Sequence, residues 1–402
     1  MSILEQKHVV LAVTGGIAAY KSAELARLFI TGGALVRVVM TKAACQFITP
    51  LTFQALTRAP VATDLWESEG SVEINHISLA DWADVVVIAP ATANIIGKMS
   101  SGIADDFLST FLLAVGAPVV ICPAMNVNMY HNPIVQENLN KLRSLNHRVV
   151  DPGYGELACG TEGQGRLAEL DHIVEETRFA LSPHDLDELT VMVTSGPTRE
   201  KWDDIRYMSN ISSGKMGMAL AKSARRRGAA VILITGPTAL PVPYGIETVS
   251  VGSTLEMQEA VHEYFERVDV LVGAAAPMDF RPAERVKGKV KKTKVPPPIE
   301  LALNPDILAG VGKNKGDKIL VGFAAEAENM IEYAKGKLKT KNLDLIVANQ
   351  IGAPGAAFAA ETNQVSIINP AGQVEQLPLL PKEEVADRIW NRILSLILER
   401  RV

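Results

Sequence analysis

The sequence predicts an α/β protein built on parallel sheets. Apolar runs of strand length alternate with amphipathic stretches of helix length from one end of the chain to the other, and this alternation is typical of βαβ units. The runs lack polar alternation, as expected of parallel strands whose two faces are both covered. With 402 residues, the chain is long enough for two or three domains, each with its own core. We therefore expect two doubly wound, Rossmann-like parallel sheets.

The first half of the chain is expected to contain four buried strands. They span residues 9–13, 35–40, 85–89 and 119–122. After the first strand, apolar residues recur at spacings of three and four from Ala18 to Ile30, which predicts a helix. Gly32 and Gly33 are placed to end that helix. A further helix is expected at residues 171–180, close to the end of the first domain.

A domain boundary is expected at the polar stretch LSPHDLDEL, which follows that helix and contains Pro183. A new strand is expected at residues 190–194, and the alternation then restarts. Further strands are expected at 231–235, 270–275, 319–323 and 345–348, with a final helix near 382–399. We therefore predict domains at residues 1–182 and 190–402. In such sheets ligands bind outside the carboxyl ends of the strands.

Composition and charge argue against several classes of protein. The 40 Lys and Arg residues face 45 Asp and Glu residues, so the basic stripe of a nucleic-acid-binding protein is not expected. No targeting segment and no apolar run of the roughly 20 residues needed for a membrane span is expected. The three cysteines are odd in number and far apart, which argues against a disulfide framework and indicates a reduced, cytoplasmic setting.

Two glycine-rich turns open predicted helices and are candidate phosphate sites. TGGIAA places Gly15 and Gly16 directly after the first strand, and SSGKMG spans residues 212–217 in the second half. Both offer backbone N–H groups at a helix start. The first departs from the dinucleotide fingerprint, so a tight turn without a ligand is its alternative interpretation. The second lacks the first glycine and the closing Ser or Thr of a Walker loop, which we therefore reject.

Three polar residues of the first half are candidates for catalysis. His76 lies before a predicted helix, and a lone histidine is more often a structural residue than a base. Asn126, in PAMNVNMY, directly follows a buried strand and is expected at the ligand-binding edge, unless it only forms a turn. Residues 153–167 contain five glycines within thirteen positions, which predicts a loop without strand or helix. This loop carries Cys159. Either the loop is a lid and Cys159 is the acid that it brings to a substrate, or Cys159 is a structural thiol.

The second half contains a basic segment and three further polar candidates. Residues 287–294 include five lysines, which usually means a solvated surface, but beside a nucleotide site such lysines neutralise phosphates. Arg206, Asn210 and Asp279 follow predicted strands or glycine turns. Asp279 is a candidate ligand for a divalent cation that bridges phosphates.

Together and in this order, the motifs resemble the bacterial bifunctional flavoproteins of coenzyme A biosynthesis, which fuse phosphopantothenoylcysteine decarboxylase to phosphopantothenate–cysteine ligase. The first half is similar to the homo-oligomeric flavin-containing Cys decarboxylases through GGIAAYK, NHISLADWAD, PATANIIGKMSSGIADDFLST, PAMNVNMY and ELACGTEGQGRLAE. The second half resembles the ligase through SGPTREKWDDIRYMSNISSGKMG, AAAPMDFRPA, KVKK, NPDIL and VGFAAE. The resemblance covers residues 5–400. It departs at Tyr130, where the family has Trp, and at Pro277-Met278, where the family commonly has Val-Ala.

For the first half, the resemblance implies FMN and a decarboxylation without net redox change. It assigns His76 as a base, Asn126 and Met129 to the substrate, and Cys159 as the acid that protonates an enethiol. Oxidation of the substrate thiol to a thioaldehyde would give the electrons released with CO₂ an acceptor. The implied FMN contacts are Gly15, Gly16, Ile17, Ala18, Ser22, Thr41, Ala91 and Met125.

For the second half, the resemblance implies that CTP activates the carboxylate of 4′-phosphopantothenate as an acyl cytidylate, from which the cysteine amine displaces CMP. Asn210 is assigned to turnover of that intermediate, by hydrogen bonding to the developing oxyanion, and Arg206 to the acyl side. Lys289 closes over the phosphates, and Mg²⁺ is held near Asp279. The implied CTP contacts are Gly273, Ala274, Ala275, Asp279, Pro305, Asp306, Ile307, Leu308, Phe323, Lys337 and Lys341.

The resemblance also implies homo-oligomers, with trimers through the flavin domain, dimers through the ligase domain and a dodecamer from both. Two alternatives remain. A nicotinamide-dependent flavin reductase would need an acidic residue about 20 positions after the glycine turn, where this chain has Met40-Thr41-Lys42. A flavin-binding regulatory module without catalysis is opposed by His76, Asn126, Cys159 and the complete ligase half.

Overall fold

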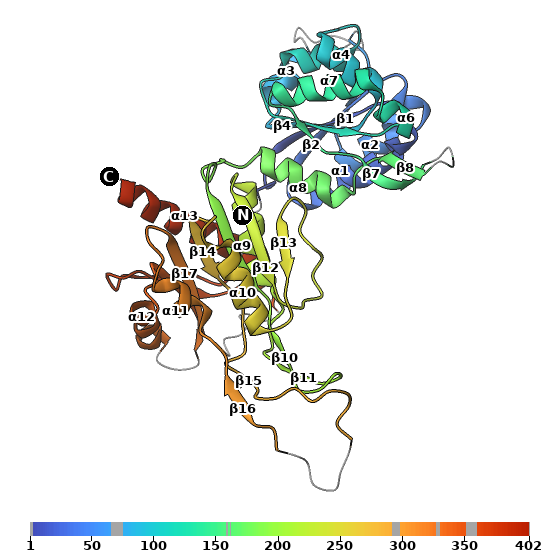
Figure 1. Ribbon diagram of the computed structural model, residues 1–402. Helices are drawn as coiled ribbons and strands as arrows, with labels where there is room; N and C mark the ends of the chain where they lie inside the picture. Colours follow the sequence, from blue (N-terminus) through green and yellow to red (C-terminus); the bar gives the residue numbers. More distant parts are fainter. Residues whose placement is uncertain are drawn as a thin grey trace. The chain divides into compact units, whose positions relative to one another are not determined.

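The computed structural model describes residues 3–65, 75–157, 160, 162–291, 298–326, 330–350 and 360–401. The chain divides into two compact units, Met1–Pro183 and His184–Val402. Each unit is built around its own largely parallel sheet with flanking helices (Figure 1). The predicted α/β class with two doubly wound parallel sheets is confirmed.

The first unit contains a six-stranded parallel sheet in the order β3-β2-β1-β4-β5-β6. Its strands are β1 (His8–Val13), β2 (Leu35–Met40), β3 (Val61–Ala62), β4 (Val85–Ala91), β5 (Val119–Pro123) and β6 (Arg148–Val149). The strand order reverses between β1 and β4. In a doubly wound sheet, the crevice for a ligand opens at the carboxyl ends of these two strands.

Helices cover both faces of this sheet. On one face Leu11 and neighbouring strand residues pack against α1 (Lys21–Thr31), α2 (Pro50–Thr57) and α8 (Leu170–Ala180). On the other face Val10 and its neighbours pack against four helices, which are α3 (Asn75–Trp82), α4 (Ala93–Ser101), α5 (Phe107–Ala114) and α7 (Pro133–Ser144). The short helices η1 (Ile17–Tyr20), η2 (Ala44–Gln46) and α6 (Val127–Tyr130) complete this unit. The expected helix end is confirmed, because Gly32 caps α1 and Gly33 follows with φ +92°.

The prediction that residues 153–167 form a loop without strands is wrong. β7 (Gly153–Glu156) and β8 (Glu162–Arg166) form an antiparallel hairpin. Gly165 is required for a close backbone contact, because it has φ +159° and a Cβ there would overlap the carbonyl oxygen of Met125. The backbone N–H of Met125 donates to the carbonyl oxygen of Gly165 at 3.0 Å. Gly165 therefore lets the hairpin dock against the segment that follows β5.

The second unit contains an eight-stranded sheet in the order β13-β12-β9-β14-β17-β18-β20-β21. Its strands are β9 (Thr190–Ser195), β12 (Ala230–Thr235), β13 (Glu247–Ser250), β14 (Val270–Gly273), β17 (Ile319–Glu326), β18 (Leu345–Gln350), β20 (Val365–Ile368) and β21 (Val374–Gln376). β20 and β21 pair antiparallel at one edge, which the sequence analysis did not anticipate. β14 ends two residues before the predicted end at 275. Beyond it, the N–H of Ala274 donates to the carbonyl oxygen of Thr194 and the N–H of Ala276 to that of Gly196, which follows β9.

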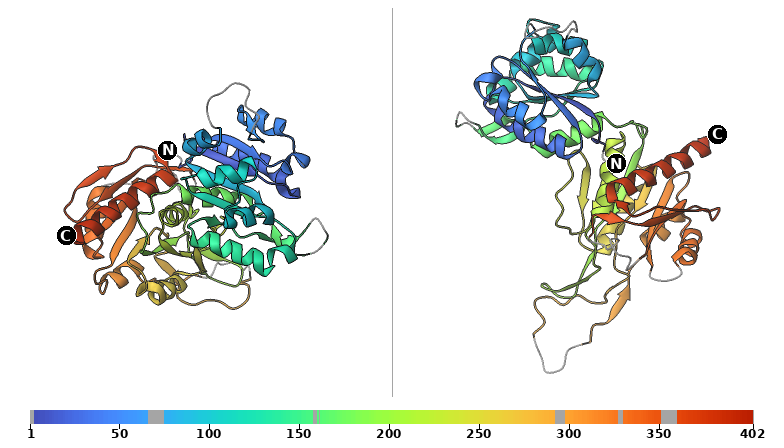
Figure 2. Two further views of the ribbon diagram at one scale, coloured as in Figure 1. Left: turned by 90° about the horizontal axis from the view of Figure 1, so that it is seen from above. Right: turned by 180° about the vertical axis from the view of Figure 1, so that it is seen from behind.

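Within the part of the chain that the structure describes, five helices flank this second sheet. They are α9 (Lys215–Arg226), α10 (Thr254–Phe265), α11 (Ile307–Gly312), α12 (Met330–Thr340) and α13 (Lys382–Arg401). α13 lies alongside α9 (Figures 1 and 2), where the fully buried Trp390 donates from Nε1 to the carbonyl oxygen of Leu220 at 2.9 Å. Among the described residues, no helix is both long enough and apolar enough to cross a bilayer.

The described residues of the second unit also form three antiparallel strand pairs outside this sheet. Two are hairpins, β10 (Arg199–Lys201) with β11 (Tyr207–Ser209) and β15 (Phe280–Pro282) with β16 (Leu301–Leu303), and the third joins β19 (Thr362–Asn363) to β22 (Leu380–Pro381), with β20 and β21 between them in the chain. The first two lie against each other beyond one end of the sheet (Figure 1). This arrangement brings the predicted residues Arg206 and Lys289 into one substructure.

Candidate active sites at the two sheet edges

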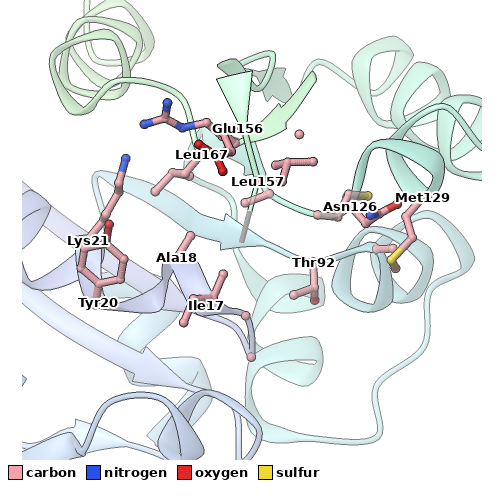
Figure 3. A pocket seen from close by; sticks show the side chains of 17 residues that line it. Ile17, Ala18, Tyr20, Lys21, Thr92, Asn126, Met129, Glu156, Leu157 and Leu167 are labelled. Carbon is pink, nitrogen blue, oxygen red and sulfur yellow. The ribbon is translucent and has the colours of Figure 1, made fainter. Parts of the chain in front are cut away.

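A cavity of about 700 Å³ lies at the carboxyl ends of β1, β4 and β5 in the first unit (Figure 3). It is enclosed by the glycine turn, the chain after β4, the chain after β5 and the β7–β8 hairpin. Its main lining residues are Gly15, Gly16, Ile17, Ala18, Tyr20, Lys21, Thr92, Met125, Asn126, Met129, Glu156, Leu157 and Arg166.

A second cavity, of about 570 Å³, adjoins the first and shares Gly15, Thr92 and Met129 with it. It extends past Thr41, which follows β2, to Asp106 at the start of α5. The two cavities together cross the point where the strand order reverses. This is the part of a doubly wound fold where a nucleotide-sized ligand is expected.

Two buried hydroxyl groups fix the backbone around this site. Thr14 donates to the carbonyl oxygen of Pro90 at 2.7 Å and accepts from the N–H of Thr92 at 3.1 Å. Ser22 donates to the carbonyl oxygen of Ala89 at 2.6 Å. All three bonds join the segment after β1 to the end of β4. The cavity floor is therefore held by contacts between residues far apart in the sequence.

Gly15 meets a steric requirement of the turn. A Cβ at this position would lie 2.9 Å from the carbonyl carbon of Ala43, closer than real side chains approach backbone. No side chain caps the start of η1 at Gly16. The glycine turn thus brings bare backbone to the edge of the cavity, as its sequence predicts.

Some of the predicted flavin and substrate residues line a cavity, and others do not. Those that line the first cavity are Gly15, Gly16, Ile17, Ala18, Met125, Asn126 and Met129, and Thr41 lines the second. Ser22 and Ala91 line neither cavity and are fully buried. His76 lies in the first turn of α3, half-buried, and does not line either cavity. Cys159 lies outside the described residues.

The charged groups near the second cavity form a compact ion pair network. Lys98 contacts Asp105 at 2.6 Å and Asp106 at 2.7 Å. Burial opposes the charge on Lys98, but these carboxylates outweigh it and raise the pKa of its ammonium. The thiol of Cys122, by contrast, is fully buried, and burial raises its pKa, so Cys122 is an unreactive core residue.

The second unit has a cavity of about 630 Å³ at the carboxyl ends of β14, β17 and β18. Its lining residues are Ser209, Asn210, Ile211, Ser212, Ser213, Gly214, Lys215, Met216, Gly217, Ala274, Ala275, Ala276, Phe323, Ala324, Asn349, Asn363 and Lys382. The predicted helix start in SSGKMG is confirmed, since α9 begins at Lys215 after Gly214 with φ +76°. Gly217 is also required, because a Cβ there would lie 2.6 Å from Oγ of Ser195.

Two lysines make this cavity cationic. Lys382 is only 7% exposed and donates to the carbonyl oxygen of Ala360 at 2.6 Å. Burial lowers the pKa of Lys382, and the nearby positive charge of Lys215 lowers it further. Lys215 pairs with the exposed carboxylate of Glu361. A phosphate group entering the cavity would relieve the repulsion between the two ammonium groups.

Asn210 is oriented by the chain that follows β14. Its Nδ2 donates to the carbonyl oxygens of Ala276 at 3.2 Å and Pro277 at 3.0 Å. Both hydrogens of the amide are thus engaged with backbone. The same chain is braced from the other side, where the N–H of Met278 donates to Oγ1 of Thr198 at 3.0 Å.

The predicted nucleotide residues of the second unit fall into two groups. Asn210, Ala274, Ala275 and Phe323 line the cavity, whereas the others do not, namely Arg206, Gly273, Asp279, Lys289, Pro305, Asp306, Ile307, Leu308, Lys337 and Lys341. Asp306 instead caps α11 by accepting from the N–H of Ala309 at 3.0 Å, and it pairs with Lys341 at 2.9 Å. Across the described ranges, no three His, Cys, Asp or Glu side chains form a metal-binding group, around Asp279 or elsewhere.

Several lining residues were not predicted from the sequence. Thr92 and Glu156 line the flavin-side cavity, and Asn349, Asn363 and Lys382 line the other. Thr92 directly follows Ala91, so the motif PATAN carried a usable signal. The last three come from segments distant in sequence from the glycine turn, and no local pattern marks them.

Two parallel-sheet units, each with a nucleotide-sized cavity at its carboxyl edge, define a two-domain α/β protein of the nucleotide- and flavin-binding class. Residues 2–181 match the Flavoprotein family, and residues 186–397 match the DNA/pantothenate metabolism flavoprotein C-terminal domain. The chain is similar to the coenzyme A biosynthesis bifunctional protein CoaBC of Bacillus subtilis (46% identity) and of Escherichia coli K12 (43% identity), in each case over 98% of both chains. The chain therefore belongs to the CoaBC family of bifunctional coenzyme A biosynthesis proteins.

Solved structures resemble each half separately. A crystal structure of the C-terminal domain of CoaBC is 41% identical and covers 54% of this chain and 99% of its own, with a TM-score of 0.47. A mutant PPC decarboxylase complexed with pantothenoylaminoethenethiol is 34% identical and covers 43% of this chain and 97% of its own, with a TM-score of 0.40. Family membership confirms the prediction of a bifunctional enzyme of coenzyme A biosynthesis, with ligase and flavin-dependent decarboxylase in one chain.

Proposed function

We propose that the second unit, which contains the predicted domain 190–402, ligates cysteine to 4′-phosphopantothenate at the expense of CTP, and that the first unit, with the predicted domain 1–182, decarboxylates the product. The observation that carries this proposal is the placement of each family motif at a cavity on its own sheet edge. The glycine turn and Asn126 meet in the first unit. SSGKMG and Asn210 meet in the second.

The first unit fits FMN. Its two adjoining cavities cross the switch point of the sheet, and the steric requirement at Gly15 keeps bare backbone at their junction. The turn from Gly15 to Ala18 and the segment at Thr41 would hold the cofactor. When bound, FMN supplies an electron acceptor that makes loss of CO₂ from a cysteinyl carboxylate feasible.

The chain's own residues then bind the substrate and move protons. Asn126 begins α6 at the cavity edge, where its side chain accepts from the N–H of Asn128 at 2.9 Å. We assign Asn126 to the substrate carboxylate, His76 to the base and Cys159 to the acid. Changing Cys159 to Ser should leave CO₂ release intact while an enethiol product accumulates. Normal yields of 4′-phosphopantetheine from this variant would contradict the assignment of Cys159.

We propose that more than one copy of the chain builds the decarboxylase site, because His76 lines neither cavity of a single copy. Ile17, Tyr20 and Met129 line the cavity, yet they are 60%, 61% and 49% exposed. Apolar side chains so exposed at a cavity mouth are suited to cover by another subunit. This supports the proposed trimer of flavin units. We extend it to ligase dimers, and hence to a dodecamer, by family resemblance.

In the second unit, a carboxylate must be activated before an amine can attack it. Lys215, Lys382 and the start of α9 would bind phosphate groups in the cavity. Asn210 uses its amide hydrogens on Ala276 and Pro277, so donation to an oxyanion requires one of these bonds to break. As placed, its amide oxygen is the atom suited to accept from the attacking cysteine amine.

Mg²⁺ and CTP complete the proposed ligase site. Mg²⁺ usually binds through one or two carboxylates together with substrate phosphates, so Asp279 needs no preformed cluster around it. Lys289 would contribute a point charge to the same phosphates. Because the reaction consumes a nucleoside triphosphate and a free thiol, we place it in the cytoplasm.

The nucleotide requirement tests the ligase proposal. Purified protein is incubated with 4′-phosphopantothenate, cysteine and either CTP, ATP, GTP or UTP, and pyrophosphate is measured. We expect pyrophosphate with CTP, at least tenfold less with the others, and none after the metal is chelated. Equal release with ATP would contradict the assignment of CTP, and release in the presence of chelator would contradict the assignment of Mg²⁺.

A further inference from the structure

A fully buried carboxylate lies where the two long hairpins of the second unit meet. Asp203 has no exposed surface, although it lies in the turn between β10 and β11. Its Oδ1 accepts from the N–H groups of Ile205 at 2.8 Å and Arg206 at 2.7 Å. Its Oδ2 accepts from the N–H of Val290 at 3.1 Å. One carboxylate thus binds two segments separated by more than eighty residues.

The two segments are Trp202–Arg206 and Val286–Val290, and further bonds run between them. The N–H of Val286 donates to the carbonyl oxygen of Trp202 at 2.9 Å, and the guanidinium of Arg206 donates to the carbonyl oxygen of Val290 at 2.9 Å. Asp204 adds a bond from the N–H of Gly288 at 2.7 Å. Both chain neighbours of Lys289 are therefore held by this turn.

The charge on Asp203 is needed for this arrangement. Burial alone would raise the pKa of this carboxyl, but the N–H groups of Ile205, Arg206 and Val290 outweigh burial and lower it. The guanidinium of Arg206 adds to this effect, with Nε 3.8 Å from Oδ2. Asp203 is thus an ionised carboxylate that accepts hydrogen bonds from three backbone N–H groups. A neutral amide cannot accept all three, because its NH₂ group would face a backbone N–H group.

We propose that Asp203 is a positioning residue of the ligase, which fixes Arg206 on the acyl side and Lys289 on the nucleotide side at one spacing. This inference rests on the proposed function, which assigns those two residues to the substrates. Asp203 itself contacts neither substrate. It acts because one carboxylate is bonded both to the backbone of Arg206 and to the residue after Lys289.

The test compares two substitutions that each remove one negative charge. Asp203→Asn loses at least one of the three bonds, whereas Glu284→Gln changes an exposed side chain in the segment that leads to Lys289. We expect Asp203→Asn to lower kcat/KM of the ligase at least tenfold, with higher KM values for both CTP and 4′-phosphopantothenate. Glu284→Gln should stay within about twofold of the unchanged protein. Equal activity of the two variants would overturn the proposal.

A double-mutant cycle separates positioning from a general effect on folding. If Asp203 acts partly through Lys289, Asp203→Asn should cost at least threefold less in a Lys289→Ala background than in the unchanged protein. An undiminished cost in that background would overturn the proposal. Each preparation is also given ready-made phosphopantothenoylcysteine, whose decarboxylation should be unchanged and thus reports an intact first unit.

Pyrophosphate release by the unchanged protein distinguishes failure of the proposed ligase function from failure of the positioning role of Asp203. If it releases no pyrophosphate from CTP, the proposed ligase function fails. If it does release pyrophosphate and Asp203→Asn is equally active, only the positioning role fails.

Discussion

The hydroxyl group of Thr14 donates to the carbonyl oxygen of Pro90 at 2.7 Å. The same oxygen of Thr14 accepts from the N–H of Thr92 at 3.1 Å, and the side chain is 1% exposed. These two bonds tie the end of β1 to the end of β4, the two strands between which the strand order of the sheet reverses. The shape of the proposed flavin site therefore depends in part on the buried hydroxyl group of Thr14.

Thr14→Val tests this connection because valine keeps the shape and removes only the hydroxyl. A buried donor or acceptor left without a partner costs about 1–3 kcal/mol, so we expect the free energy of unfolding to fall by about 2 kcal/mol. Thr110→Val is the matched control. The hydroxyl of Thr110 donates to the carbonyl oxygen of Asp106, which also accepts the N–H of Thr110 and so stays paired. Equal unfolding midpoints of the two variants in urea would contradict this account.

Gly165→Ala tests the docking of the β7–β8 hairpin. A Cβ at this position would overlap the carbonyl oxygen of Met125, next to Asn126, and the backbone has φ +159°. We expect the rate of CO₂ release to fall at least tenfold while ligation continues at its normal rate. Gly153→Ala is the control in the same hairpin, since the nearest atoms to its Cβ lie 4.0 Å away. Full decarboxylase activity of Gly165→Ala would show that the hairpin does not shape the site.

Strand positions were predictable because parallel strands are covered on both faces. The run at residues 35–40 was predicted with the same bounds as β2. The hairpin at residues 153–166 was missed because its glycines, read by composition, indicated a loop. Gly165 is needed there for contact with Met125, which no local pattern reveals. The close contact between these two backbone segments depends on the tertiary fold. The sequence shows the glycine but not the residue that it contacts.

Asn210→Asp tests the ligase half. The amide group of Asn210 donates to the carbonyl oxygens of Ala276 and Pro277, and a carboxylate would repel both. We expect the rate of amide formation to fall at least a hundredfold, with acyl cytidylate accumulating on the protein. The control is decarboxylation of added phosphopantothenoylcysteine by the same sample, which should be unaffected. Amide formation at the normal rate would rule out a role for Asn210 in turnover.

The candidate ligase site was only partly predictable. The motif around Asn210 was found because its residues are contiguous with a glycine-opened helix. Lys382 lines the same cavity from the start of α13, more than 160 positions later, and gave no signal in the sequence. The pairing of Asp203 with Val290 was hidden for the same reason, since only the fold brings these residues together.

Asp106 predicts a defined dependence of stability on pH. Burial opposes its ionisation, but Lys98 and Ser109 outweigh burial and lower its pKa below the usual 3.8. A carboxyl whose pKa is lowered by folding stabilises the folded protein above its unfolded pKa, and this contribution is lost as pH falls through the folded value. Asp106→Asn keeps the cap of α5 and removes the ion pair, which is partly exposed, so we expect a loss of about 0.5–1 kcal/mol near neutral pH.

Urea unfolding of both proteins at several pH values measures this effect. The difference in unfolding free energy should be constant between about pH 5 and 8 and shrink below about pH 4. A difference that changes between about pH 5 and 8 would contradict the assigned direction of the Asp106 pKa shift.

The central claim is that two sheet edges of one chain carry out consecutive reactions. It is tested most directly by giving the purified, FMN-loaded protein 4′-phosphopantothenate, cysteine, CTP and Mg²⁺, and quantifying every product in one sample by mass spectrometry and CO₂ capture. We predict CMP, pyrophosphate, CO₂ and 4′-phosphopantetheine in equal amounts at completion. A sample that forms no amide, or that forms phosphopantothenoylcysteine but never releases CO₂ from it, would contradict the claim.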